Sequence, residues 1–297
     1  MRLRSLLLLL GVLAWLAPAL AASAADPLTV AVTIAPQEYF LKKVGGGRVQ
    51  PLLLVPAGAD PHVYEPRPGQ MKSLARAAAW LTTGLEMEEA WSARFRAVNP
   101  GMKVAATDAG IAKLTMAGRG HEGDGHAGDG GRHELPDPHV WLSPSLAKVQ
   151  AAAMRDALSA LDPAGAAEYA ANAEEFAAEC DALAREVMTL LTDLPSRTFL
   201  VFHPSWGYFA RDFGLAQLSI EAEGKEPSPR ELARLVDQAR EHGIRAIFVA
   251  PQFSRRTAGV VARELGAGLV EADPLAPDWA DNLRRVARAL AAAKTRN

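Results

Sequence analysis

Residues 28–55 read LTVAVTIAPQEYFLKKVGGGRVQPLLLV, and this stretch decides the fold class. Its first seven residues are β-rich, whereas Pro36 and the residues up to Val44 favour a helix that three glycines then end. Residues 49–55 return to strand-forming side chains. A strand, one helix and a second strand in succession predict a βαβ unit, whose two strands are parallel.

The same alternation continues on both sides of a helical middle segment. In the first half it predicts helices at 68–76 and 86–98 around a strand at 78–82. In the second half the expected strands are 198–202, 215–220, 246–249 and 269–271, and the expected helices are 204–213, 229–242, 254–265 and 278–293. The fold class is therefore α/β, with two lobes built on mostly parallel sheets.

The middle segment between the lobes is helical. Helix-forming residues run from Pro144, with Ser143 as the N-cap, to Leu161, and again from Pro163 to Leu191. At about 1.5 Å per residue the second run reaches ~40 Å, which is the width of a lobe. We expect this long helix to be a stiff connector.

The composition narrows the classes of function. With 297 residues, 49% of them hydrophobic and 22% charged, the chain can form two ordinary cores. The chain has 32 Lys and Arg against 34 Asp and Glu, and no basic stripe stands out in the sequence. Both observations argue against nucleic acid as a partner. Cys180 is the single cysteine, so an intrachain disulfide and an all-cysteine metal site are excluded, and we expect Cys180 to be a small buried residue.

The first residues are typical of a secretory signal. Arg2 and Arg4 precede an apolar run at residues 6–16, which is too short to span a bilayer comfortably. The small residues that follow place cleavage after Ala21 or Ala24. Residues 1–24 are therefore predicted to be a signal peptide, and the mature chain to be exported.

Three of the seven histidines lie beside a proline, between a strand or loop and the next helix. His62 and His139 each end an Asp-Pro-His sequence, His203 precedes Pro204, and Asp273 begins an Asp-Pro-Leu sequence after the last strand. Open parallel sheets bind their ligands at such turns. Three imidazoles and a carboxylate suit a borderline cation such as Zn²⁺, although any one such histidine, taken singly, is more often a structural residue.

The sequence resembles a known family in four segments. They are GADPHVYEP at 58–66, DPHVWLSP at 137–144, FHPSWGYF at 202–209 and DPL at 273–275. In order and spacing they are similar to the ligand segments of the periplasmic metal-binding proteins (cluster A-I) of zinc and manganese ABC importers, and the likeness covers nearly the whole mature chain. The resemblance implies two Rossmann-like lobes, residues 25–143 and 193–297, joined by a rigid helical connector, 144–192, with the metal in the cleft between the lobes.

The resemblance also implies the ligands. His62 and His139 match the ligands of the first lobe, His203 matches the next ligand, and Asp273 matches the fourth. The third position is commonly glutamate in the manganese branch, so His203 favours zinc. Water or the nearby Glu65 remains an alternative to Asp273.

By this resemblance the protein is an extracytoplasmic zinc receptor, not an enzyme. It is expected to be a monomer in the periplasm that delivers Zn²⁺ to an ABC permease of the inner membrane. A manganese receptor of the same fold is one alternative. A zinc-dependent hydrolase is another, although no H-E-x-x-H, nucleophile elbow or phosphate loop is present.

A glycine-rich segment at residues 117–138 is too polar to fold alone and predicts a mobile loop. Its histidines, His121, His126 and His133, resemble the histidine-rich insertion of zinc-specific family members, which implies weak metal capture. The alternative is a solvated loop whose histidines only titrate.

Other residues have simpler interpretations. Trp141 and Trp206 are expected to pack in the core, and His242 to stabilise the end of a helix. Three acids after a second-lobe strand either orient the ligand imidazoles or lie in a solvated loop: Glu221, Glu223 and Glu226.

Overall fold

The structure is a computed structural model, which describes residues 26–116, 136–194, 196–221, 227–253 and 255–293. The predicted signal peptide at residues 1–24 lies outside the described residues, as do His121, His126 and His133. Within the described parts of the chain, no helix is both long enough and apolar enough to cross a membrane.

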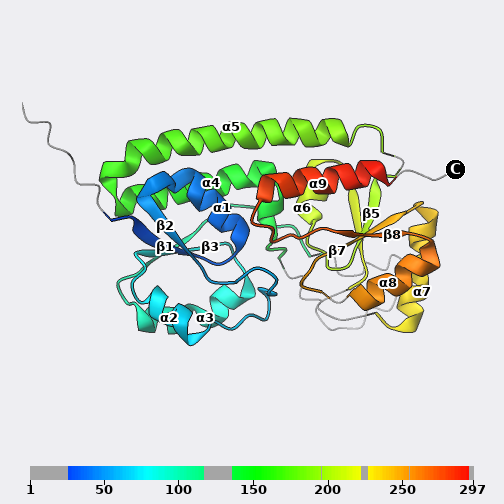
Figure 1. Cartoon of the computed structure of the whole chain (residues 1–297), viewed down its shortest axis with the longest axis horizontal. Coiled ribbons are helices and arrows are strands. Elements are labelled where there is room, and N and C mark those ends of the chain that lie inside the picture. Colours follow the sequence, from blue (N-terminus) through cyan, green and yellow to red (C-terminus); the bar gives the residue numbers. More distant parts are fainter. Residues whose placement is uncertain (1–25, 117–135, 195, 222–226, 254, 294–297) are drawn as a thin grey trace, which may run out of the picture.

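The first lobe is a four-stranded parallel sheet with helices on both sides (Figure 1). Its strands are β1 (Leu28–Val32), β2 (Val49–Leu53), β3 (Ala79–Thr82) and β4 (Lys103–Ala106), in the order β2-β1-β3-β4. Its helices are α1 (Ala35–Gly45), α2 (Pro68–Leu74) and α3 (Glu86–Val98). The quoted stretch at 28–55 forms the predicted parallel βαβ unit, in which Leu28 pairs with Val49 and Val32 with Leu53.

The second lobe repeats this sheet order. Its strands are β5 (Thr198–Val201), β6 (Ala216–Ser219), β7 (Ala246–Val249) and β8 (Gly268–Glu271), all parallel and in the order β6-β5-β7-β8. Its helices are α6 (Gly207–Asp212), α7 (Pro229–Glu241), α8 (Arg255–Leu265) and α9 (Trp279–Ala292). The α/β fold class is therefore confirmed. In each sheet the strand order reverses beside the first strand, and such a reversal leaves a crevice at the carboxyl ends of the strands.

Helices α4 (Pro144–Leu161) and α5 (Ala166–Leu190) connect the two lobes. Helix α5 runs along both lobes in Figure 1, packing on α1 and α4 at one end and on α9 at the other. Its 25 residues span roughly 37 Å. The predicted helix start at Pro163 is wrong, because residues 163–165 form a separate 3₁₀ turn in which the Gly165 N–H donates to the Asp162 carbonyl.

The lobes share one core where α1, α5 and α9 meet. The ring of Trp279 in α9 lies 4.9 Å from that of Phe40 in α1 and 6.0 Å from that of Phe176 in α5, measured between centroids. Cys180 is buried in this core, as expected. Because apolar surface is shared across the connection, a wide separation of the lobes would expose it to water.

Two more elements differ from the sequence prediction. Strand β4 was not expected, since its alternation is weak: it is an edge strand with mostly exposed residues. Helix α6 begins at Gly207 rather than Pro204, because the Pro204 carbonyl accepts from Nε2 of Gln217 over 3.2 Å and a helical bond runs instead from the Ala210 N–H to the Trp206 carbonyl.

Candidate metal centre

His62 lies in the turn that follows β2, at the carboxyl edge of the first sheet. Its Asp-Pro-His sequence folds as a tight turn in which the His62 N–H donates to Oδ1 of Asp60 over 2.9 Å. An aspartate commonly accepts from the backbone two residues ahead, and proline restricts the backbone between them. The motif therefore determines the local backbone conformation around this histidine.

His139 is presented by a second turn of the same kind. The His139 N–H donates to Oδ1 of Asp137 over 2.9 Å, and a 3₁₀ turn, Val140–Leu142, follows at once. This segment is held against the second lobe, because the Tyr208 hydroxyl donates to the carbonyl of Asp137 and the Trp141 indole N–H to the carbonyl of Pro274, both over 2.8 Å. His139 thus lies at the junction of the lobes.

His203 follows β5 in the second lobe and, like His139, is buried. The ring of Phe253, from the turn after β7, stacks on its imidazole with centroids 4.9 Å apart and planes inclined by 24°. Stacking restricts the rotation of the imidazole about its side-chain bonds.

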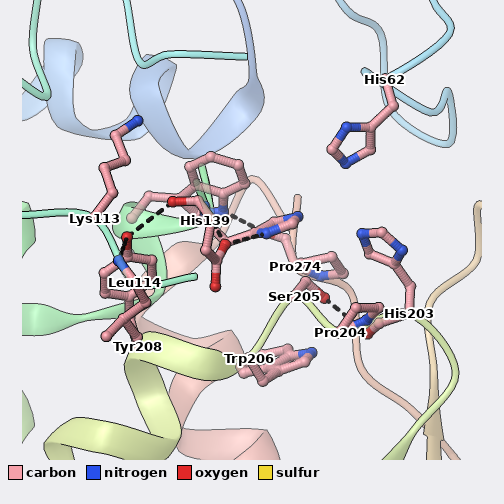
Figure 2. Close-up of polar contacts among 12 residues, drawn as sticks. His62, Lys113, Leu114, His139, His203, Pro204, Ser205, Trp206, Tyr208 and Pro274 are labelled. Atoms are coloured by element: carbon pink, nitrogen blue, oxygen red, sulfur yellow. Dashed lines mark hydrogen bonds and ion pairs between the residues drawn. The ribbon is translucent and has the colours of Figure 1, made fainter. Parts of the chain in front are cut away.

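The three imidazoles meet at one point between the lobes. One ring nitrogen from each of His62, His139 and His203 lies within 4.8 Å of the other two, and the ring centroids are 5.3–5.6 Å apart. Figure 2 shows the three rings converging from different segments of the chain. They line a cavity of about 10 Å³, which holds one sphere the size of a water molecule.

Each imidazole has a carboxylate beside its Nδ1 atom. The distances are 2.9 Å from His62 to Glu86, 2.7 Å from His139 to Asp137 and 3.2 Å from His203 to Glu221. A carboxylate at Nδ1 keeps the proton on that nitrogen and leaves the Nε2 lone pair for a metal. The Nε2 atom of His203 is buried and has no hydrogen-bond partner among the described residues.

Burial and the neighbouring carboxylate act in opposite directions on the pKa of His62 and of His139. Burial lowers the pKa of His62, but the hydrogen bond and charge of Glu86 outweigh burial and leave the pKa raised above 6.5. The same hydrogen bond lowers the pKa of Glu86 to about 2. Burial lowers the pKa of His139, an effect that the charge of Asp137 only partly offsets. His139 is therefore held neutral, as a metal ligand must be, whereas at His62 a proton competes with the metal.

Asp273 lies beside the cluster rather than within it. Its Asp-Pro-Leu sequence forms a third turn of the same type, in which the Leu275 N–H donates to Oδ1 over 2.9 Å. The same oxygen accepts from Nε2 of Gln252 over 2.8 Å. Within the described residues, the group of mutually close ligand atoms contains the three imidazoles and no carboxylate, and Glu65 is exposed.

Two of the three carboxylate partners of the imidazoles were not predicted from the sequence. Asp137 belongs to the quoted motif, but its second bond, to the imidazole of the same motif, was not foreseen. Glu86, at the first turn of α3, carried no signal beyond its place after β3. Glu221 is buried and orients His203, one of the two predicted roles, whereas Glu223 and Glu226 lie outside the described residues.

The remaining expectations concern packing. Trp141 and Trp206 are buried, as predicted. His242 is the C-cap of α7 and is exposed, and Gly243 follows it in the left-handed conformation at φ 64°.

The fold and this site together define a class: a two-lobe α/β binding protein in which both lobes bring imidazoles to one point. A family model described as "ZnuA: Zinc-uptake complex component A periplasmic" matches residues 30–293. The chain belongs to this ZnuA family.

Relatives and solved structures agree with this assignment. The zinc-binding lipoprotein AdcA of Streptococcus pneumoniae is 30% identical over 84% of this chain, and the chain spans about half the length of AdcA, 50% of it. A zinc-bound ZnuA deletion mutant is 42% identical with a TM-score of 0.83, covering 92% of this chain and all of that one. A manganese-bound mutant periplasmic metal-binding protein from Candidatus Liberibacter asiaticus is 25% identical with a TM-score of 0.75, covering 89% of this chain and 99% of that one.

Proposed function

We propose that this protein is an extracytoplasmic receptor for Zn²⁺ that hands the ion to an ABC permease. The observation that carries the proposal is the convergence of three ring nitrogens within 4.8 Å around a cavity of about 10 Å³. Buried imidazoles repel one another once protonated, and a buried acceptor without a donor costs about 1–3 kcal/mol. A cation between the rings removes both penalties.

The proposed ligands are Nε2 of His62, His139 and His203 and a carboxylate oxygen of Asp273. On this proposal Asp273 reaches the ion when its turn moves towards the cavity, which the adjoining Pro274 and Leu275 line. Four short bonds of this kind match the tetrahedral preference of Zn²⁺.

The donor set favours zinc over manganese. Three imidazoles are borderline nitrogen donors, and affinity at such sites rises from Mn²⁺ towards the later metals of the row. Mn²⁺ is better served by oxygen donors and a larger coordination number, which this small cavity does not provide.

A receptor fits the cavity better than a hydrolase does. In a hydrolytic site an ester or phosphoester has to fit together with the attacking water. Sites for organic ligands therefore measure about 300–1,000 Å³. The cavity between the imidazoles has room for one ion but not for such a substrate, which supports the proposal that the metal is cargo.

The proposal also gives a role to each of the remaining segments of the chain. Residues 1–24 direct export and are removed, leaving the lobes 25–143 and 193–297 and the connector 144–192 as a monomer in the periplasm. On the same proposal His121, His126 and His133 capture metal weakly and raise its local concentration.

Titration of metal-free protein with Zn²⁺ against a chromophoric chelator tests the proposal. One tight site per chain is expected, with its affinity lowered when His62, His139 or His203 is replaced by alanine. His242→Ala is the matched control, because His242 is exposed at the end of α7. The proposal fails if the unaltered protein takes up no zinc, or if the triple alanine variant binds zinc as tightly as the control.

A further inference from the structure

Gln252 lies in the turn between β7 and α8 and lines the metal cavity together with the three imidazoles. Its Nε2 donates to Oδ1 of Asp273 over 2.8 Å, and the backbone N–H of Leu275 donates to the same oxygen over 2.9 Å. A carboxylate oxygen has two lone pairs. With two donors, Oδ1 of Asp273 has no lone pair left for a metal.

The oxygen of the Gln252 amide indicates that the bond from Nε2 to Asp273 determines where this side chain lies. Oε1 of Gln252 is buried and accepts no hydrogen bond from the described residues. Leaving such an acceptor unpaired costs about 1–3 kcal/mol. Another interaction of the same side chain has to offset this cost. The amide orientation is defined by its donation to Asp273, because a carboxylate accepts and cannot donate.

We propose that Gln252 is a specificity-determining residue, which occupies Oδ1 of Asp273 and so restricts this carboxylate to one metal bond through Oδ2. The inference rests on the proposed function, in which Asp273 is the fourth ligand. Three imidazoles and one carboxylate oxygen complete a four-coordinate site. Binding of the ion by both carboxylate oxygens, which would raise the coordination number, requires the Gln252 bond to break.

Coordination number is the property that separates the competing ions. Zn²⁺ is satisfied by four ligands in a tetrahedron, whereas Mn²⁺ favours six oxygen-rich ones. A glutamine that blocks the fifth bond therefore disfavours manganese without touching either ion. The turn that carries Gln252 is itself anchored, because the neighbouring Phe253 stacks on His203 and packs against Phe202.

Gln252→Met tests the inference, since methionine keeps the length of the side chain and removes the donor. The test compares this variant with the unaltered protein in the dissociation constants of Zn²⁺ and Mn²⁺ and in the visible spectrum of the Co²⁺-loaded form. Tetrahedral Co²⁺ absorbs strongly because its site lacks a centre of symmetry, and added ligands weaken the bands. The preference for zinc over manganese is expected to fall by about tenfold or more, together with the cobalt absorbance.

Controls separate this role from a general loss of structure. Gln238→Met, on the exposed surface of α7, should change neither measurement. Gln252→Ala should act as Gln252→Met does, and either substitution should have no effect when Asp273 is already alanine, because Gln252 acts through that carboxylate.

The outcomes distinguish the inference from the proposed function. If the unaltered protein binds zinc tightly and Gln252→Met changes neither the metal preference nor the cobalt spectrum, the specificity role is refuted and the receptor stands. An equal effect of Gln252→Met with and without Asp273 also refutes it. If the unaltered protein binds no zinc, the receptor proposal itself is overturned.

Discussion

The buried pair of Asp137 and His139 offers a quantitative test of how the site is tuned. The 2.7 Å hydrogen bond, the imidazole ring and a Zn–N bond of about 2.0 Å place the carboxylate roughly 7 Å from a bound ion. At an effective dielectric constant of about 20, a unit charge at that distance from a dication contributes at most ~5 kcal/mol, and in bulk water ~1 kcal/mol. Asp137 is 2% exposed, so the larger figure is its upper bound.

Asp137→Asn removes this charge and keeps an oxygen that can accept from His139. We expect zinc affinity to fall by about 10–100-fold, or about 1.4–2.8 kcal/mol. The loss is smaller than the bound because the buried carboxylate also costs desolvation in the unaltered protein. Glu86→Gln is the matched comparison: its side chain is 52% exposed, solvent screens its charge, and the expected loss is at most about 1 kcal/mol.

Chelator competition at neutral pH measures both affinities, and thermal unfolding of the metal-free variants checks that they fold. The reasoning is refuted if Glu86→Gln lowers zinc affinity as much as Asp137→Asn does. An unchanged affinity in Asp137→Asn would refute it too, since the buried charge would then have no influence on the metal.

Three further predictions concern a buried carboxyl group and two glycines. Burial raises the pKa of Glu88 to about 7 from 4.5, so between these values the folded protein keeps a proton that the unfolded chain has lost. Stability should therefore fall by up to roughly 3 kcal/mol as pH rises from about 5 to 8, and in denaturant titrations Glu88→Gln should flatten this slope while the exposed Glu89→Gln should not. A Cβ atom on Gly207 would lie 2.9 Å from Oδ2 of Asp137, so Gly207→Ala should displace that carboxylate and weaken zinc binding in the same competition assay. Gly259→Ala in α8 meets only an ordinary contact at 3.7 Å and should instead stabilise the protein by about 0.5–1 kcal/mol without changing zinc affinity.

Local turns were predictable because their chemistry lies within a few neighbouring residues. Asp60, Asp137 and Asp273 each precede proline, and each accepts the backbone N–H two residues ahead. The same sequence thus builds the same turn three times at the edges of two sheets. Glycine likewise marks helix ends at Gly243 and Gly266, whose φ angles of 64° and 60° are unfavourable for other residues.

Contacts between distant residues were harder to predict. Glu86 is 24 residues from His62, and Glu221 is 18 residues from His203. Gln252 is 21 residues from Asp273. No periodicity links such pairs, because they meet only where the carboxyl ends of separate strands share one edge of a sheet.

By itself, the sequence determined the alternation of strands and helices, the long connecting helix and the turns that present His62, His139 and Asp273. Hydrophobic periodicity, proline and glycine act over a few residues, and they carry this information directly. Only the tertiary structure decided that imidazoles from both lobes come within 4.8 Å, that a carboxylate holds each Nδ1, and that Gln252 occupies one oxygen of Asp273. Those contacts depend on how the two sheets and the shared core pack, and packing is a property of the whole folded chain.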